Sequence, residues 1–477
     1  ILTLIFIQLI GVTAAYAEPP ARPDENNLTA EFAEFRRTQV ESVAYELLFK
    51  FARGRGTYEG NARIDLELRT LQYPLSIDFS SKAIRRITVD GVPVTDFVLR
   101  DGSFDIPARH LKKRMRIGVE YQNTFSTTGA GIQRFVDAAD GEDYLFTDFE
   151  PYEAHTLFPS LDQPDLKASY RVQLEIPADW KAIANSPVES SETIEGGKRV
   201  TMKPTPPISS YLVFVGAGPY AEWKDHYEDG AGGVPLSIFA RQSMAKFVDA
   251  ERVFAVTKKG LGFFTAYFDY AYPFAKYDQI FAPELGPGAM ENPGAVTLRE
   301  SMIYKGAVSD SVLDGRANTI LHEMADMWFG DLVTMKWWND LWLNESFATY
   351  MAFMAQAEAF QLDSVWQDFF SEKTWGYWQD TLVTTHPIET VVSDTNTAMS
   401  NFDGITYAKG GAALKQLQFY VGADAFRAGV RAYFKKYAWQ NTTREDFISA
   451  IADAASLDLS GWTRSWLQSA GPNAVHA

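Results

Sequence analysis

Four residues in the second half of the chain have the types and the spacing that suit a bound metal ion. His322 and Asp326 are four positions apart, so on a helix both side chains project from the same face. Glu345 follows nineteen positions after Asp326 and can supply a third ligand from the start of another helix. Glu323 comes directly after the histidine and can take a proton from water beside the metal. By itself, H-E-x-x-D more often marks an amphipathic helix with a charged, solvated face, so the metal site needs further support.

The composition limits which chemistry this chain can perform. Its 477 residues include no cysteine, which excludes disulfides, thiolate zinc sites and a cysteine nucleophile. Six histidines are present, so an imidazole ligand or base must come from that short set. Lys and Arg number 44 against 61 Asp and Glu, a formal charge of −17, which argues against a phosphate-backbone partner. We therefore expect a folded, acidic protein that does not bind nucleic acid.

The hydrophobic pattern between residues 41 and 240 indicates strands. Hydrophobic and polar residues alternate with a period of two in several segments, for example at Ile64, Leu66 and Leu68. Asp-Gly pairs at residues 90–91 and 101–102 supply turns between such segments. The pattern therefore predicts one antiparallel β domain over residues 41–240, preceded at 18–40 by a polar linker and a short helix.

The pattern changes at about residue 242 and then indicates helices. Hydrophobic residues recur with helical spacing in five clear segments, at residues 248–268, 317–329, 344–360, 407–420 and 425–437. Residues 241–477 are therefore predicted to form an α-rich domain that contains the H-E-x-x-D segment.

Longer motifs around this segment resemble those of the gluzincin zinc aminopeptidase family, which is aminopeptidase N-like. Upstream lies Gly288-Ala289-Met290-Glu291-Asn292, and downstream lie Trp328-Phe329-Gly330-Asp331-Leu332-Val333-Thr334 and Trp337-Trp338-Asn339-Asp340. The resemblance runs from about residue 40 to the last residues. It implies an α+β fold, with an N-terminal antiparallel β saddle or sandwich followed by a thermolysin-like catalytic domain. It also implies a metalloprotease that hydrolyses peptides from a free N-terminus.

The resemblance assigns roles to the residues of the metal hypothesis. One Zn²⁺ ion per chain is expected on His322, Asp326 and Glu345, with Glu323 as the general base. Tyr407, in Ile405-Thr406-Tyr407-Ala408-Lys409-Gly410, matches the tyrosine that donates to the oxyanion. A neutral hydroxyl suits that role because it stabilises negative charge without competing for the metal.

The resemblance also implies a site for the α-ammonium group of the substrate. Glu291 is expected to bind this group, within a loop that includes Gly288, Ala289, Met290 and Asn292. A second anchor precedes it in Thr147-Asp148-Phe149-Glu150-Pro151, where Glu150 matches the anionic residue and Asp148 stands where Gln is common. Two carboxylates at the closed end of a cleft can bind the free N-terminus so that the first peptide bond lies at the reactive groups. An exopeptidase that removes one residue needs this arrangement.

Asp326 departs from the family pattern, which has a second histidine there. Aspartate is shorter, anionic and a harder ligand than imidazole, and it can reach an ion through a water molecule. Two carboxylates and one histidine also cancel the charge of Zn²⁺, so the metal acidifies water less and zinc affinity is expected to fall. Two interpretations follow: a weakened aminopeptidase, or a peptide-binding relative without turnover. Epoxide hydrolysis, as in one animal relative, has no support in these residues.

The two ends of the sequence carry further expectations. Residues 1–17 combine an apolar stretch with Ala15-Tyr16-Ala17, which predicts a secretory signal peptide whose basic n-region is missing. A membrane anchor is the alternative, but the apolar run is shorter than the roughly 20 residues that a spanning helix needs. We expect an exported protein, periplasmic or extracellular (secreted), with no membrane span in the mature chain. Family members usually carry a further helical C-terminal domain, so this sequence is expected to be a fragment. The oligomeric state is left open.

Overall fold

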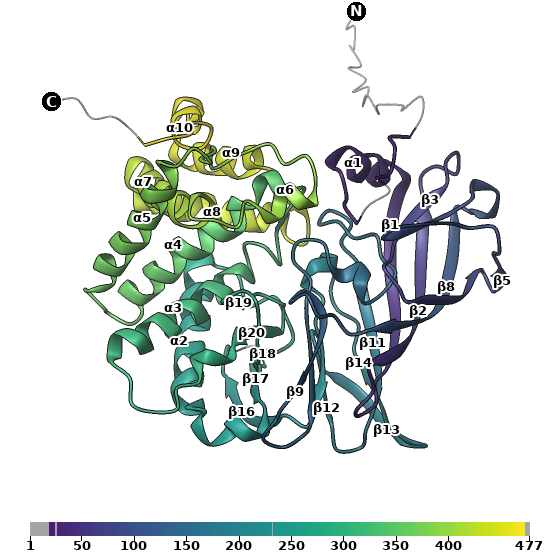
Figure 1. Cartoon of the computed structure of the whole chain (residues 1–477). Coiled ribbons are helices and arrows are strands. Elements are labelled where there is room, and N and C mark those ends of the chain that lie inside the picture. Colours follow the sequence, from purple (N-terminus) through teal and green to yellow (C-terminus); the bar gives the residue numbers. More distant parts are fainter. Residues whose placement is uncertain (1–18, 24–25, 231, 473–477) are drawn as a thin grey trace, which may run out of the picture.

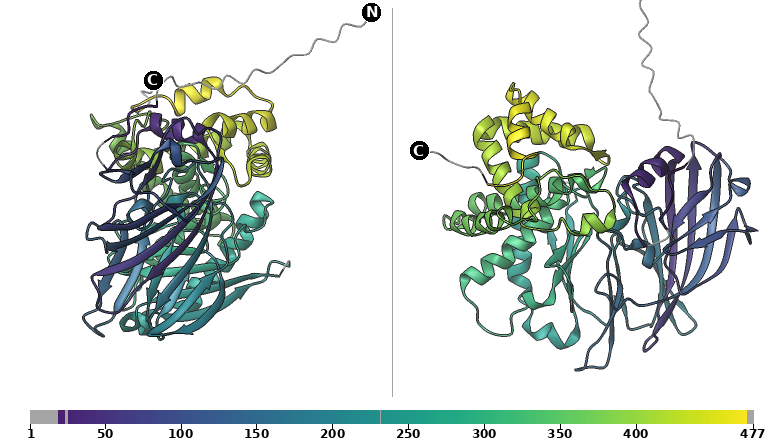
Figure 2. Two further views of the ribbon diagram at one scale, coloured as in Figure 1. Left: turned by 90° about the vertical axis from the view of Figure 1, so that its right-hand side faces the viewer. Right: turned by 45° about the horizontal axis from the view of Figure 1, so that its top comes forward.

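The computed structural model describes residues 19–23, 26–230 and 232–472 and shows two domains side by side (Figure 1). The N-terminal domain is built from strands, and most helices belong to the C-terminal domain. Figure 2 shows the same division from two further directions. The expected α+β fold, with a β domain ahead of an α-rich domain, is confirmed. The signal peptide expected at residues 1–17 lies outside the described residues.

The largest sheet of the N-terminal domain has eight strands. Their side chains alternate as the sequence pattern predicts, and in β2 the residues Ile64, Leu66 and Leu68 are all buried. Most neighbours are antiparallel, but β1 and β11 pair in parallel. The expectation of a purely antiparallel domain was wrong at this pair, because parallel strands need a crossover connection that no local turn signal reveals. In spatial order the strands are β13 (Val188–Ile194), β14 (Gly197–Met202), β11 (Ser169–Ile176), β1 (Val40–Lys50), β2 (Thr57–Leu68), β8 (Arg114–Thr124), β4 (Ala83–Val89) and β5 (Val92–Pro93).

Two smaller sheets complete this domain. One has the order β3 (Leu75–Asp78), β7 (Ser103–Ile106) and β6 (Val98–Arg100). The other has the order β12 (Lys181–Ala184), β15 (Val215–Gly218), β10 (Asp143–Asp148) and β9 (Gly131–Val136). All six residues of β10 are buried, and the strand ends directly before Phe149 and Glu150. This sheet therefore delivers the predicted second ammonium anchor.

A five-stranded mixed sheet belongs to the C-terminal domain. Its order is β16 (Ala221–Tyr227), β17 (Val234–Ala240), β18 (Tyr277–Ala282), β20 (Ala295–Arg299) and β19 (Ala289–Met290). β17 pairs with β18 in parallel, so residues 221–240 share a sheet with residues that were assigned to the second domain. By sheet membership, the boundary expected at residue 240 lies near residue 220. The hydrophobic alternation of β16 and β17 identified them as strands but could not say which sheet they would join.

Helices cover this mixed sheet and continue beyond it. The helix predicted at 317–329 begins earlier and ends at Asp326, and the segment predicted at 407–420 starts as a π-helical turn, Ile405–Lys409. The helices are α1 (Ala30–Gln39), α2 (Ala250–Phe268), α3 (Asp310–Asp326), α4 (Trp342–Glu358), α5 (Val365–Asp380), α6 (Thr395–Met399), α7 (Gly410–Val421), α8 (Ala423–Tyr437), α9 (Arg444–Ala455) and α10 (Ser460–Trp466). Among the described residues, none of these is long and apolar enough to cross a bilayer.

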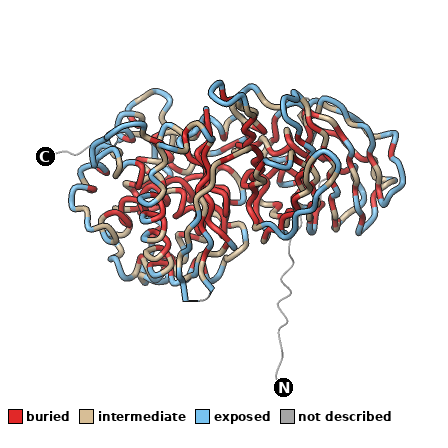
Figure 3. The backbone as a smooth tube through the Cα atoms, turned by 90° about the horizontal axis from the view of Figure 1, so that it is seen from below, coloured by how far each residue is buried: buried red, intermediate tan, exposed pale blue. Residues whose placement is uncertain are grey.

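The core of the C-terminal domain surrounds α4. Fifteen of its seventeen residues are buried, so this helix is enclosed on nearly every side. Figure 3 shows buried chain running through the interior of both domains. A helix enclosed in this way cannot shift easily, because well-packed interiors resist displacement. The first turn of α4 is therefore a rigid position for a functional side chain.

Candidate active site

The last turn of α3 and the first turn of α4 bring the predicted metal ligands together. His322 and Asp326 lie on α3, and Glu345 lies on α4. His322 Nε2 is 3.2 Å from Glu345 Oε2 and 3.7 Å from Asp326 Oδ2. Between the helices, the backbone N–H of Asp331 donates to the carbonyl of Asp326 at 2.9 Å, which holds the connecting loop against the end of α3. The His322 ring nitrogen thus faces one carboxylate from its own helix and one from α4.

Asp326 is the deepest of these three residues. It is 2% exposed, and among the described residues its Oδ1 has no hydrogen-bond partner. Burial, followed by the nearby carboxylates of Glu291 and Glu345, raises the pKa of Asp326 well above its usual value. His322 and Glu345 line the cavity described below, whereas Asp326 does not. A cation within reach of its free oxygen would relieve this uncompensated burial.

Three glutamates form a cluster in the site, and one of them, Glu150, comes from the β domain. Carboxylate oxygens of Glu150, Glu291 and Glu345 all lie within 4.8 Å of one another. Glu150 follows β10, Glu291 follows β19, and Glu345 lies in the first turn of α4. Among the described residues, one buried oxygen of Glu150 and one of Glu291 have no hydrogen-bond partner. This three-glutamate group differs from the predicted ligand set, and Glu345 is the residue that both share.

The shifted pKa values of the clustered carboxylates indicate that too little positive charge lies near them. Burial raises the pKa of Glu150 and of Glu323 well above the usual value, and neighbouring carboxylates, Glu291 first, raise it further. Burial and then Glu345 raise the pKa of Glu291 to about 8. Carboxylates that are this close together and this deeply buried can all be ionised only when cations bind beside them. One imidazole and several carboxylate oxygens form a donor set that fits a divalent ion such as Zn²⁺, with carboxylates left over for an ammonium group.

These residues line a cavity of about 630 Å³. Asp148 is 6% exposed and faces this cavity, and burial raises its pKa to about 7. The predicted residues that line the cavity are Asp148, Glu150, Gly288, Ala289, Met290, Glu291, His322, Glu323, Glu345 and Tyr407. The cavity thus brings together almost all of the residues that the sequence singled out, from both domains.

Asn292 lies behind the cavity rather than in its lining. It is fully buried, and its Nδ2 donates to the carbonyl of Leu212 in the β domain at 3.3 Å. Thr297 Oγ1 donates to its Oδ1 at 3.2 Å. Asn292 therefore holds the loop that carries Glu291 against the β domain.

Tyr407 lines the same cavity as the glutamates. It sits in the π-helical turn before α7, and such turns frequently occur at functional sites. Its ring lies 6.0 Å from the ring of His322 between centroids. Burial first, and then the carboxylates led by Glu345, raise the pKa of Tyr407 well above its usual value. The hydroxyl therefore stays protonated and able to donate a hydrogen bond.

Several lining residues were missed in the sequence. Asn318 and Thr319 lie four and three residues before His322 on α3, so helical spacing from the histidine was a signal that could have found them. Residues 128–130, Met399 and Phe402 also line the cavity, but they come from loops and a short helix whose position no local pattern predicts.

A larger cavity of about 900 Å³ lies elsewhere, between α1, β1 and residues 336–340 and 439–443. Its described lining includes Trp337, Asn339 and Asp340 of the downstream motif, but it contains no histidine and none of the predicted metal-binding, catalytic or ammonium-binding residues. Size alone does not make a reactive site, and convergent ionisable groups with shifted pKa values are the stronger indication. We therefore place the candidate active site in the smaller cavity.

A β domain ahead of a helix-covered mixed sheet, with a carboxylate-rich cavity at the end of an H-E-x-x-D helix, is characteristic of the metallopeptidase class of fold. Comparison with known proteins agrees. Residues 41–212 match the Peptidase M1 N-terminal domain, and residues 252–466 match the Peptidase family M1 domain. The chain belongs to peptidase family M1.

Individual relatives show how far the similarity extends. Aminopeptidase N of Streptomyces lividans is 42% identical over 456 residues, which cover 94% of this chain and 52% of that protein. Tricorn protease-interacting factor F2 of Thermoplasma acidophilum is 32% identical over 90% of this chain and 53% of its own length. Aminopeptidase M1 of Arabidopsis thaliana is 35% identical over 69% of this chain and 37% of its own length. The chain therefore spans about half the length of the relatives that it matches.

Proposed function

We propose that this chain forms the substrate-binding and catalytic part of a zinc-dependent aminopeptidase that removes N-terminal residues from peptides. The observation that carries the proposal is the convergence of Glu150, Glu291 and Glu345 within 4.8 Å of one another. His322 and Glu323 lie beside them in the same cavity. A free α-ammonium group supplies the positive charge that two of these buried carboxylates lack, whereas a blocked N-terminus does not.

The roles of the residues follow from their places around the cavity. Glu291 and Glu150 bind the α-ammonium group and so fix the scissile bond one residue from the end of the peptide. Glu323 takes a proton from the attacking water and can return it to the leaving amine. The Tyr407 hydroxyl donates to the oxygen on which negative charge develops. A Zn²⁺ ion held by His322, Glu345 and Asp326 would supply Lewis-acid activation of the peptide carbonyl and of water.

We further propose that Asp326 lowers the zinc affinity and the turnover of this site. Its side chain adds a negative charge where an imidazole would be neutral, and it lies beneath the cavity lining. The second candidate function, peptide binding without turnover, is favoured by the same observation. Under that alternative, Glu150 and Glu291 still bind free N-termini.

Export to the periplasm or the exterior is also a proposal, and it is supported by the apolar N-terminal stretch and its Ala-Tyr-Ala pattern. N-terminal sequencing of the secreted product tests it. We expect processing after Ala17 and a mature chain that begins at Glu18. Retention of the unprocessed chain in the cytoplasm would contradict it.

Metal analysis and hydrolysis of an aminoacyl chromogenic substrate test the enzymatic proposal together. We expect one zinc ion per chain, measurable release of the chromophore, and loss of activity in Glu323→Gln with zinc retained. Glu251→Gln, on the exposed side of α2, is the matched control and should behave as the natural chain. Zinc binding and free-amine selectivity without any turnover would favour the peptide-binding alternative, and absence of both would reject the assignment.

A further inference from the structure

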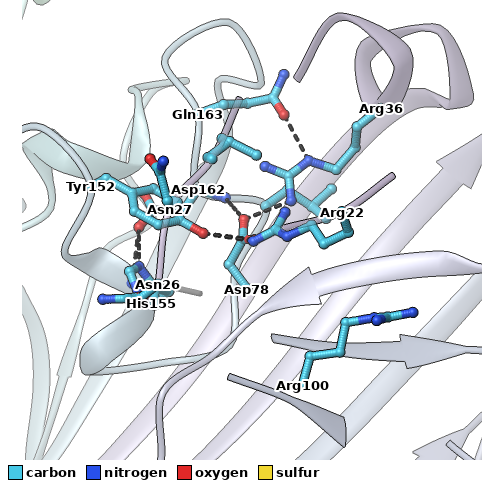
Figure 4. A network of polar contacts seen from close by, with 12 residues as sticks. Arg22, Asn26, Asn27, Arg36, Asp78, Arg100, Tyr152, His155, Asp162 and Gln163 are labelled. Atoms are coloured by element: carbon cyan, nitrogen blue, oxygen red, sulfur yellow. Dashed lines mark hydrogen bonds and ion pairs between the residues drawn. The ribbon is translucent and has the colours of Figure 1, made fainter. Parts of the chain in front are cut away.

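A short segment that leads into α1 contacts two stretches of chain that adjoin the lining of the candidate active site, namely the turn after Glu150 and the start of α6. We call residues 22–23 and 26–30 the N-terminal clasp. Figure 4 shows its side chains Arg22, Asn26 and Asn27 beside a buried polar network of the β domain. Other members of the clasp hydrogen-bond to the segment that precedes α6 in the C-terminal domain. The clasp therefore bridges two parts of the chain that are far apart in sequence.

The first contact of the clasp is a buried ion pair. The Arg22 guanidinium pairs with Asp78 and donates to the Tyr152 hydroxyl at 2.7 Å. The Arg22 side chain is 5% exposed and that of Asp78 is 0% exposed. The Tyr152 hydroxyl donates to Asp78 Oδ1 at 3.0 Å, and Arg36 contacts Asp78 Oδ2 at 2.6 Å. The Asp78 carboxylate is thus shared by two buried arginines and one hydroxyl, so Arg22 is one member of a specific, connected polar network.

This network supports the turn that carries Glu150. Tyr152 follows Glu150 by two residues, and its hydroxyl is the group that Arg22 holds. Farther along the same turn, His155 Nε2 lies 2.6 Å from Asn26 Oδ1, and His155 Nδ1 lies 2.9 Å from Asp162 Oδ2. The clasp thus holds the turn at two points directly after the predicted ammonium anchor.

The other end of the clasp contacts the start of α6 in the C-terminal domain. Asn27 Oδ1 accepts from Thr395 Oγ1 at 2.8 Å and from the backbone N–H of Asn396 at 3.3 Å. The backbone N–H of Leu28 donates to Thr395 Oγ1 at 3.1 Å, and the N–H of Thr395 donates to the Leu28 carbonyl at 3.0 Å. The N–H of Ala30 donates to the carbonyl of residue 393 at 2.8 Å. These bonds pin the start of α6 to the clasp.

The segment that the clasp contacts at residues 393–396 continues directly into the lining of the cavity. Met399 ends α6, Phe402 follows it, and Tyr407 lies in the next turn, and all three line the cavity. Glu150, which follows β10 of the β domain, lines the same cavity. The clasp therefore ties the residue that would bind the substrate ammonium to the wall that would face the substrate side chain and oxyanion.

We propose that the N-terminal clasp is a positioning element that sets the spacing between Glu150 and the wall formed by Met399, Phe402 and Tyr407. This inference rests on the proposed function, because only an aminopeptidase needs a fixed distance between these groups. That distance decides how well one N-terminal residue fits between Glu150 and the oxyanion donor Tyr407. Arg22 and Asn27 touch no substrate and act through Tyr152 and Thr395. Such placement matters because small displacements of reacting groups have large effects on rate.

The test uses point variants of the full chain and two readouts. The variants are Arg22→Ala, Arg22→Lys and Asn27→Ala, and the control is Arg85→Ala, which removes an exposed pair with Glu59 at 2.7 Å. Hydrogen exchange of backbone amides is measured over residues 150–158 and 393–407. Binding is measured for leucine amide and for N-acetyl-leucine amide. The first readout requires neither turnover nor peptide binding.

We expect Arg22→Ala to speed exchange over residues 150–158 by about 10-fold or more and Asn27→Ala to do so over residues 393–407. Both should lower the preference for the free amine over the blocked ligand by about 10-fold or more, with lysine at position 22 restoring part of it. Arg85→Ala should change neither readout. Unchanged exchange in both segments, or faster exchange with a natural ligand preference, would overturn the inference.

Three further outcomes are also interpretable. If Arg22→Ala fails to fold, Asn27→Ala carries the test alone, since it removes a single side-chain amide at the other end of the clasp. If the natural chain itself shows no preference for the free amine, the proposed function fails and the positioning role fails with it. A natural preference that both variants retain would reject the clasp and leave the proposed function standing.

Discussion

The ring of His322 and the ring of Tyr407 lie nearly parallel, with their centroids 6.0 Å apart and their planes at 16°. The histidine lies near the C-terminal end of α3, and the tyrosine belongs to the π-helical turn before α7. Because Glu345 stands within 3.2 Å of the same imidazole, the phenol, the imidazole and the carboxylate face one reaction space. This relationship supports the proposed role of Tyr407 as a neutral hydrogen-bond donor.

Tyr407→Phe should therefore reduce kcat by about 100-fold to 1,000-fold while KM changes little. The hydroxyl acts on charge that develops in the transition state, so its loss affects turnover more than binding. Steady-state kinetics on an aminoacyl chromogenic substrate measure the effect. Tyr377→Phe, on the exposed side of α5, is the matched control. A rise in KM with unchanged kcat would assign Tyr407 to ground-state binding instead.

Glu291→Gln and Glu150→Gln should each weaken binding of free-amine peptides by about 1.5–3 kcal/mol, because each removes a charge-assisted contact to the α-ammonium group. N-acetylated peptides should bind equally poorly to the natural chain and to both variants. Calorimetric titration of the two ligand types measures this difference, with Glu251→Gln as the control. Equal losses for blocked and free peptides would remove these residues from the ammonium site. The measurement also works if the protein has no turnover.

Asp326→His should raise zinc affinity and turnover, because it replaces a buried carboxylate with a neutral ligand and restores the net positive charge of the site. Even residues that only support metal ligands change affinity or activity by about 10–100-fold, so a ligand replacement should produce at least that order of gain. Competitive metal titration and kinetics on the two proteins measure it. Thermal unfolding reports whether the larger ring is accommodated at this buried position.

Two results would change the interpretation of Asp326. If the natural chain already binds zinc tightly and turns over as fast as the variant, aspartate is a competent ligand and the charge argument is wrong. If the variant is folded and binds zinc but remains inert, the peptide-binding alternative gains support.

His386 should make stability depend on pH. Burial disfavours its charged form, but hydrogen bonds to Asp403 Oδ2 at 3.1 Å and to the Pro387 carbonyl at 2.7 Å outweigh burial and the charge of Lys409, and they raise the pKa of His386 above its usual value. A raised pKa means that the folded chain holds this proton more tightly than the unfolded chain does. The stabilisation is therefore fully present below the unfolded pKa of about 6.5 and is lost as the pH rises through the folded value.

Denaturant unfolding of the natural chain and of His386→Gln at pH 5.5 and pH 8.5 measures this contribution. We expect the natural chain to be the more stable at pH 5.5, with the difference shrinking at pH 8.5. The difference should stay below about 1 kcal/mol, because the pair is partly exposed and solvent screens it. A stability difference that grows with pH would contradict the assigned direction.

Local pattern was enough to predict much of the framework. The alternation at Ile64, Leu66 and Leu68 identified β2, and helical spacing identified α2, α4 and α8 to within a few residues at each end. The i, i+4 spacing of His322 and Asp326 indicated two side chains on one helix face, and in the structure Asp326 Oδ2 lies 3.7 Å from His322 Nε2. Such features depend on the conformation of a few consecutive residues, so the periodicity of the chain encodes them directly.

Only the tertiary structure decided how distant segments meet. Nothing local indicated the parallel pairing of β1 with β11, the entry of β16 and β17 into the sheet of the second domain, or the bridge that Arg22 and Asn27 make between the turn after Glu150 and the start of α6. The meeting of Glu150 with Glu345 depends likewise on the packing of two domains. The sequence by itself determined which residues carry charge and which face of each element they occupy. Their distances, their burial and hence their shifted pKa values depend on long-range packing, which sums many weak contacts over the whole chain.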